Sequence, residues 1–151
     1  MTKDARSRSQ SGLDARREAR SGHSAALLAL EEEFWMRGLE HVAGVDEAGR
    51  GPLAGPVLAA AVVLPRGLFI DGVDDSKRLR ASVREELARK IREQALACAI
   101  GAASSREVDR LNILQATHLA MRRALDRLSL IPDHVIVDGL PVPALGEAQT
   151  A

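Results

Sequence analysis

The chain has 151 residues with 21 basic and 21 acidic side chains, and 46% of its residues are hydrophobic, which suits one domain with a buried core. An aromatic content of 2%, without tyrosine, argues against a protein that binds nucleic-acid bases mainly by stacking. The single Cys98 excludes an intrachain disulfide, no apolar run is long enough to span a bilayer, and the start lacks the layout of a secretory signal. A cytoplasmic protein without a membrane partner is therefore expected.

Residues 1–24 differ in charge and composition from the rest of the chain. They carry six basic and three acidic residues and few branched apolar ones, so they cannot bury enough surface to offset the entropy lost on ordering. Asp4, Asp14 and Glu18 argue against a transit peptide. The composition predicts a disordered basic tail over 1–24 and one domain over 25–151.

The next stretch predicts one helix and two strands. Apolar residues at helical spacing indicate a helix over 25–37, which Gly38 ends. A short strand should cover 42–47, and the all-apolar run over 57–64 predicts a second strand that is buried on both faces. The connection between them is too short for a helical crossover, so the two strands should be antiparallel neighbours.

Two Ser-x-x-Glu pairs predict helix starts in the second half of the chain. Residues 66–81 are loop-like, and Ser82 with Glu85 has the spacing of a capping box at the start of a helix. A strand should return over 97–103. Ser104 and Glu107 then repeat the capping-box spacing, which predicts the start of a further helix.

That further helix should continue without a break to about Ser129. Its apolar face is predicted from residues that recur at steps of three and four, namely Leu111, Leu114, His118, Met121, Leu125 and Leu128. His118 lies on this apolar face and is interpreted as a core residue. A last strand over 134–138 ends in an acid, and no further element is expected after it.

Three carboxylates lie at strand ends. Asp46 and Asp138 each close a short apolar strand, and open α/β sheets place their sites at that edge. Neighbouring strands are about 4.8 Å apart, so acids at one level can share a pair of metal ions roughly 3.5–4 Å apart. Glu47 should point to the opposite face unless the strand twists or bulges there. A single strand-end Asp is more often a solvated terminus, so only the set indicates a site, and it favours magnesium or manganese over zinc.

Gly49-Arg50-Gly51 brings unhindered backbone N–H groups and a guanidinium next to these acids. Such a loop suits a phosphate or a sugar, although an isolated G-x-G is more often a plain turn. The stretch also matches the G-x-G-x-x-A dinucleotide fingerprint, which opens a helix after a strand. Here Pro52 and Pro56 lead into another strand, and the preceding acids would repel a pyrophosphate, so the dinucleotide interpretation ranks lower.

Together these residues resemble the ribonuclease HII family, the prokaryotic type 2 ribonuclease H. The resemblance rests on VAGVDEAGRGPLAGPV at 42–57, DDSKRL at 74–79, IGAASSREVDRLNILQATHLAM at 100–121 and VIVDG at 135–139. It implies an α/β, ribonuclease H-like fold with a central mixed β-sheet flanked by helices. It also implies a monomeric, metal-dependent endonuclease that cleaves the RNA strand of RNA–DNA hybrids and nicks 5′ of ribonucleotides embedded in duplex DNA, as in ribonucleotide excision repair.

The resemblance further implies roles for the acids. Asp46, Glu47 and Asp138 would be three of four carboxylates that hold two divalent ions, manganese or magnesium. One ion would activate a water and the other would stabilise the leaving 3′ oxygen, giving 5′-phosphate and 3′-hydroxyl ends.

The resemblance assigns substrate contacts as well. The backbone of Gly49, Arg50 and Gly51 would recognise the 2′-hydroxyl at the RNA–DNA junction. The remaining contacts would come from Ser76 and Lys77, near the cut, and from Asn112, facing the other strand. As a bare charge run, the basic stretch around Lys77 is more often a solvated surface.

One departure from the family pattern concerns the end of the sequence. Family members continue with another acid in a Lys-Gly-Asp stretch and then with helices that include a junction-contacting tyrosine, whereas the sequence stops at Ala151. A chain that lacks the family's C-terminal helices and its fourth carboxylate is therefore expected. Three functions stay open: the ribonuclease, an inactive fragment that binds hybrid duplex through Arg50, Lys77 and the arginines after it, and, least favoured, a dinucleotide-binding module.

Overall fold

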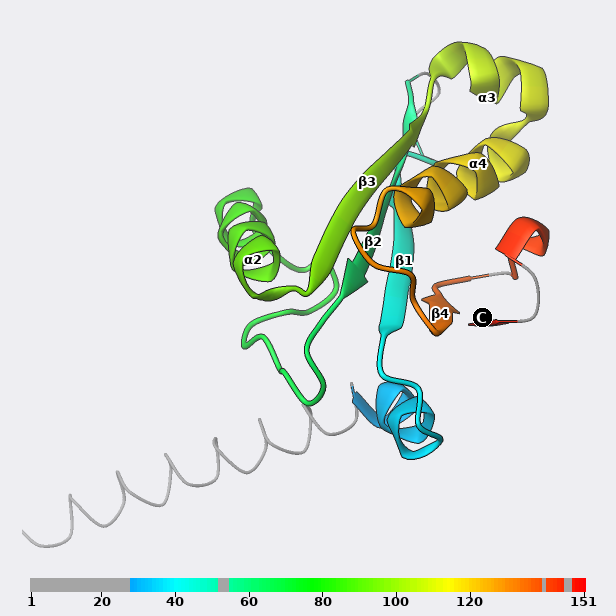
Figure 1. The fold of residues 1–151 in the computed structure, drawn as a ribbon. Helices are drawn as coiled ribbons and strands as arrows, with labels where there is room; N and C mark the ends of the chain where they lie inside the picture. Colours follow the sequence, from blue (N-terminus) through cyan, green and yellow to red (C-terminus); the bar gives the residue numbers. More distant parts are fainter. Residues whose placement is uncertain (1–27, 52–54, 140, 146–147) are drawn as a thin grey trace, which may run out of the picture.

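A computed structural model of the chain describes residues 28–51, 55–139, 141–145 and 148–151. The predicted tail over 1–24 and the start of the first predicted helix lie outside these residues. The described strands form one five-stranded sheet in the order β3-β2-β1-β4-β5. The predicted α/β class with a central mixed sheet is confirmed (Figure 1).

The sheet consists of β1 (Val42–Ala48), β2 (Val57–Val63), β3 (Ala97–Ala103), β4 (His134–Val137) and β5 (Gln149–Thr150). β2 is antiparallel to both β1 and β3, as predicted for the first two strands. β4 is parallel to β1, and β5 is parallel to β4. The expectation that no element follows the strand ending at Asp138 was wrong, because the short 3-10 helix η1 (Pro143–Leu145) and β5 follow it.

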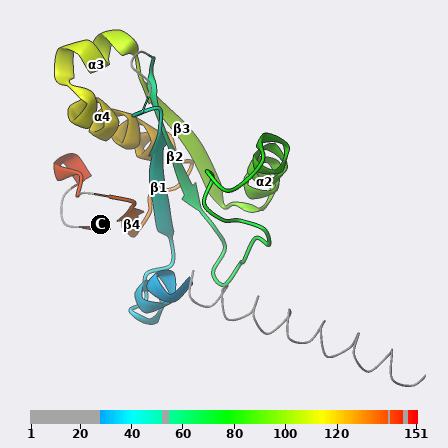
Figure 2. The same ribbon diagram turned by 180° about the vertical axis from the view of Figure 1, so that it is seen from behind.

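The helices lie on both sides of this sheet. The N-terminal helix has described residues 28–36, and it is followed by α2 (Ala81–Gln94), α3 (Ser105–Leu111) and α4 (Ile113–Asp126). α4 runs along one face of the sheet and α2 lies on the other side, as the two opposite views show (Figures 1 and 2). Within the described part of the chain, no helix is long and apolar enough to cross a membrane.

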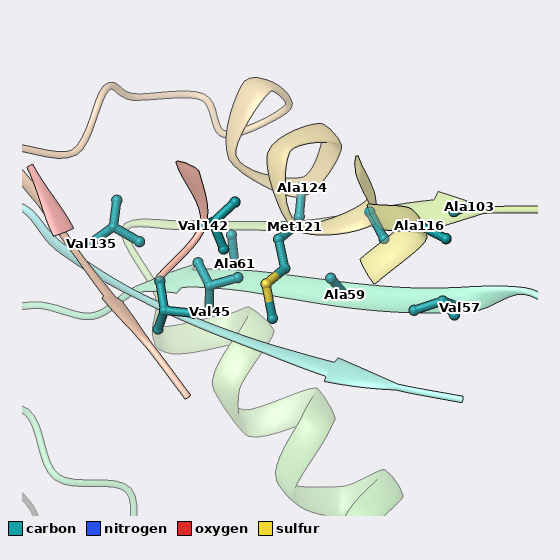
Figure 3. Packing of buried hydrophobic residues seen from close by; sticks show 12 residues of the cluster. Val45, Val57, Ala59, Ala61, Ala103, Ala116, Met121, Ala124, Val135 and Val142 are labelled. Carbon is teal, nitrogen blue, oxygen red and sulfur yellow. The ribbon is translucent and has the colours of Figure 1, made fainter. Parts of the chain in front are cut away.

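The core between α4 and the sheet combines alanines and Met121 of the helix with valines and alanines of the strands (Figure 3). Ala116, Ala120 and Ala124 are completely buried on α4. On β3, Gly101 faces the same helix, and a Cβ there would overlap the Ala120 carbonyl oxygen and the Ala124 nitrogen. These residues therefore bring the helix backbone close to the sheet, which fixes the position of α4 relative to β1.

The other face of β2 is open. Val57, Ala59, Ala61 and Val63 are buried, whereas Leu58 is 43% exposed. The all-apolar run is therefore a strand, but the prediction that both of its faces are buried was wrong. Side chains of a strand alternate between faces, and the described elements cover only the face toward α4 along most of β2.

The N-terminal helix packs at the beginning of β1. Phe34 and Trp35 are buried with Val42, and the Phe34 ring stacks on His134 with ring centroids 4.0 Å apart. Gly38 has φ +85°, so it ends the helix as predicted.

The start of α2 differs from its prediction. α2 begins at Ala81 with Arg80 as its N-cap and no side-chain cap, so the capping box of Ser82 and Glu85 was wrong. Arg84 instead donates to the Leu79 carbonyl oxygen at 2.6 Å and thereby holds the chain that enters the helix.

The helix predicted to run from Ser104 to about Ser129 is two helices. Ser104 and Glu107 do form the predicted capping box, but Asn112 has φ +69° and separates α3 from α4. The Asn112 side chain accepts a hydrogen bond from the Gln115 N–H at 3.1 Å and caps α4. The unbroken periodicity of apolar residues concealed this break, because the cap depends on one polar residue between them. α4 then ends at Asp126 rather than near Ser129.

Candidate metal and nucleic-acid site

The three predicted carboxylates lie at the same end of two adjacent parallel strands. β1 and β4 pair with Val45 opposite Val137, and the Asp138 N–H continues the ladder to the Val45 carbonyl oxygen at 3.1 Å. Asp138 therefore lies at the level of Asp46, as the sequence predicted.

Asp46 and Glu47 point to opposite faces of the sheet. Asp46 lines a groove of about 480 Å³ on the open face, together with Ala60, Val62 and Asp138. Glu47 lines a smaller cavity of about 110 Å³ on the α4 side, and Asp138 lines that cavity as well. The difficulty foreseen for Glu47 is therefore present in the structure, and Asp138 is the carboxylate common to both sides.

Electrostatics couple these acids. Asp46 is exposed as a residue, but neighbouring atoms partly desolvate its carboxyl group, and this loss of hydration raises its pKa above the usual range. The negative charges of Asp138 and Glu47 raise the pKa further. The Glu47 backbone N–H, which donates to Asp46 Oδ1 at 2.7 Å, and the Lys77 ammonium oppose this rise. The positive groups near Asp46 therefore only partly stabilise its charged form.

The donors suit a hard divalent cation in kind. Carboxylate oxygens are the ligands that magnesium and manganese prefer, and magnesium commonly takes one or two carboxylates and completes its shell with water and phosphate oxygens. Among the described residues, no group of three or more His, Cys, Asp or Glu side chains is close enough to hold a metal ion. The arrangement fits an ion that binds carboxylates in pairs, such as Asp46 with Asp138, rather than one enclosed by protein alone.

The glycine loop follows β1 directly. Gly49 has φ +96°, and a Cβ there would lie 2.7 Å from the Pro56 carbonyl oxygen, so this position requires glycine. Among the described residues, a Cβ on Gly51 would have no neighbour within 4 Å, so these residues leave room for a ligand to approach that backbone. Arg50 turns back to the acids, and its Nη1 donates to Glu47 Oε1 at 3.1 Å.

The other residues predicted to contact substrate are less closely linked to the three acids than the glycine loop is. Lys77 is exposed and close enough to influence the Asp46 carboxyl. Ser76 is exposed on the same loop, and its carbonyl oxygen accepts from Arg84 at 3.3 Å. Asn112 caps α4 two residues before Leu114, which lines the α4-side cavity. Among the contacts of the described residues, none joins Ser76 or Asn112 to the three acids.

Sequence reasoning missed the wall that α4 contributes. Thr117 and His118 line the α4-side cavity with Glu47 and Asp138. Thr117 is 2% exposed, and its hydroxyl donates to the Ile113 carbonyl oxygen at 2.8 Å. His118 is partly buried and lines this cavity, which corrects its interpretation as a core residue. The sequence does contain a sign of this wall, namely two adjacent polar residues in the apolar helix that begins after Asn112.

The chain is similar to proteins of one family. The ribonuclease HII family profile matches residues 43–150. The ribonuclease HII of Moorella thermoacetica is 54% identical over 125 residues, which cover 83% of this chain and 61% of that protein. The ribonuclease HII of Syntrophotalea carbinolica is 57% identical over 117 residues, which cover 77% and 56% of the two chains.

A solved structure agrees with these relatives. The ribonuclease H2 of Pyrococcus horikoshii superposes with a TM-score of 0.58 at 31% identity, covering 65% of this chain and 49% of the other. The chain thus spans about half the length of the relatives that it matches. The match includes β1 with its acids, the glycine loop and the strand before Asp138. The chain belongs to the ribonuclease HII family.

Proposed function

We propose that this chain carries the metal and substrate contacts of an endonuclease that hydrolyses the RNA strand of RNA–DNA hybrids and nicks 5′ of ribonucleotides embedded in duplex DNA. The observation that carries the proposal is the position of Asp46 and Asp138 at one level of adjacent parallel strands, next to the glycine loop. Membership of the family supports the reaction class. The cytoplasmic location and the monomeric state expected from the sequence stay predictions.

The proposed site residues act by binding and orientation. Asp46, Glu47 and Asp138 would hold divalent cations, and these ions would supply an activated water and stabilise the leaving 3′ oxygen, giving 5′-phosphate and 3′-hydroxyl ends. The raised pKa of Asp46 supports this role, because a bound cation would offset both the partial loss of hydration and the like charges that disfavour the ionised form.

The proposed substrate contacts surround the acids. The open backbone at Gly51 gives a ribose 2′-hydroxyl room to approach, and DNA lacks that group. Lys77 is exposed and close enough to Asp46 to lower the pKa of that carboxyl, so its ammonium is available for a phosphate next to the acids. Ser76 and Asn112 remain proposed contacts to the backbone near the cut and to the other strand.

A second candidate function is hybrid binding without cleavage. It is favoured by one observation: within the described part of the chain, three metal-binding side chains do not converge on one point. The dinucleotide-binding alternative loses support, since the next described element after the glycine loop is β2 and not a helix.

One experiment separates the first two candidates. A duplex with a single embedded ribonucleotide is incubated with the protein and manganese, and nicking is followed on a denaturing gel while binding is followed by fluorescence anisotropy. We expect nicking 5′ of the ribonucleotide, and its loss by at least 100-fold in Asp46→Asn and Asp138→Asn, because neutral amides are poor ligands for a hard cation. Asp126→Asn changes an exposed acid that lines neither cavity of the site and serves as the control. Binding without nicking by the unaltered chain would reject cleavage in favour of the second candidate.

A further inference from the structure

The ion pair between Arg50 and Glu47 occupies a proposed metal ligand. Arg50 Nη1 lies 3.1 Å from Glu47 Oε1, and the two side chains are 47% and 16% exposed, respectively. Both line the α4-side cavity together with Asp138. The same carboxylate that would bind a cation therefore accepts a hydrogen bond from a guanidinium.

We propose that Arg50 and a divalent cation compete for the Glu47 carboxylate, so that metal binding releases the Arg50 guanidinium to a phosphate of the nucleic acid. This inference rests on the proposed function, since it takes Glu47 as a metal ligand. It adds a positioning role for the Arg50 side chain to the backbone role of its loop.

The surroundings of the pair make this exchange feasible. Partly exposed ion pairs are weak, because water competes for both partners, so a divalent cation can displace the guanidinium. Arg50 lies between two glycines, and among the described residues nothing lies within 4 Å of a Cβ built on Gly51, so these residues leave the backbone next to Arg50 uncrowded. A released guanidinium offers forked N–H donors that match a phosphate.

The exchange has a thermodynamic consequence. When a nucleic acid engages Arg50, it removes the competitor for Glu47, so duplex binding tightens metal binding, and metal binding tightens duplex binding by the same factor. In the metal-free protein, Arg50 is paired with Glu47. This contact lowers the affinity for the metal in the absence of nucleic acid, and the affinity for nucleic acid in the absence of the metal.

The first test measures manganese affinity by isothermal titration calorimetry without nucleic acid. Arg50→Ala should tighten manganese binding by about two- to tenfold, since it removes both a competitor and a nearby positive charge. The manganese affinity of Arg50→Lys should lie between that of the unaltered protein and that of Arg50→Ala. Arg89→Ala breaks another Arg–Glu pair, with Glu93 at 2.7 Å on α2, and should leave the affinity unchanged. In the Glu47→Gln background, Arg50→Ala should have a smaller effect or none.

The second test observes the guanidinium directly. In a titration with magnesium, which is diamagnetic, the Arg50 side-chain Nε–Hε NMR signal should shift in the unaltered protein and stay in place in Glu47→Gln. Manganese binding that is equal or weaker in Arg50→Ala, or an Arg50 signal that does not respond to magnesium, would overturn the exchange while leaving the metal site intact. An unaltered protein that binds no manganese would overturn the proposed function together with the exchange.

Discussion

Replacing Gly101 with alanine should strongly destabilise the protein, because α4 packs against β3 at that point with no space for a side chain. The added Cβ would overlap the Ala120 carbonyl oxygen and the Ala124 nitrogen, and it would lie 2.9 Å from the Arg123 carbonyl carbon, where ordinary contact begins at 3.4 Å. All three atoms belong to the helix backbone, which cannot rotate away as a side chain can. The helix would have to retreat by about 1 Å, which also loosens its contacts along the sheet.

The expected cost is more than about 3 kcal/mol, at the upper end of the range for overpacked cores and a large part of the roughly 5–15 kcal/mol that stabilises a domain. Urea unfolding followed by circular dichroism measures it. Gly44→Ala is the matched control: Gly44 lies on β1, and a Cβ there would have no neighbour within 4 Å, so its effect should stay below about 1 kcal/mol. If Gly101→Ala lowers the free energy of unfolding by less than about 1 kcal/mol, the close packing of α4 against β3 is refuted. The position of the cavity wall depends on that packing.

Four further predictions concern the glycine loop, Asp46 and the two residues of the α3 capping box. Gly49→Ala should lower the free energy of unfolding by about 1–3 kcal/mol, because φ +96° and the Pro56 carbonyl oxygen at 2.7 Å both oppose a Cβ, whereas Gly51→Ala should stay within about 0.5 kcal/mol in the same urea assay. Asp46→Asn should raise the melting temperature of the metal-free protein at pH 7. The pKa of Asp46 is raised in the folded state, so ionisation above that pKa costs stability, and this cost disappears as the pH falls; a gain that is as large at pH 3 as at pH 7 would contradict this account. Ser104→Ala should cost about 0.5–2 kcal/mol through loss of the capping box. Glu107→Gln should flatten the acid limb of the stability profile, because hydrogen bonds from Arg123 and Ser104 lower the pKa of Glu107 from 4.5 to about 2, a contribution that is complete above the unfolded pKa and is lost as the pH falls toward about 2.

Several features of the fold could be predicted because their causes are local. The apolar runs that form β1 and β4 are short and end in acids, and the short connection after β1 requires an antiparallel neighbour. The Ser104 capping box is a contact between residues three positions apart. The sharing of one sheet edge by Asp46 and Asp138 follows from the parallel pairing that open α/β sheets favour.

Other features could not be predicted because they depend on distant parts of the chain. The burial of one face of β2 depends on which helices cover the sheet. Because the sequence of β2 is apolar throughout, it does not indicate that the other face is open. The need for glycine at position 101 could not be predicted, because it arises from the contact of β3 with α4 at that residue. The two-residue β5 is too short for periodicity to reveal, and its pairing with β4 defines it as a strand.

The distribution of the acids over two faces of the sheet determines how the candidate site could work. Asp46 and Asp138 line the groove on the open face, whereas Glu47 and Asp138 line the cavity toward α4, where Thr117 and His118 form the wall. Under the proposed function, Asp138 would therefore supply a carboxylate to a divalent cation on either side, with Asp46 or Glu47 as the second ligand. Water and phosphate oxygens of the substrate would supply the remaining ligands. Metal affinity measured without substrate would in that case underestimate the affinity of the site in the complex, since part of its ligand set arrives with the duplex.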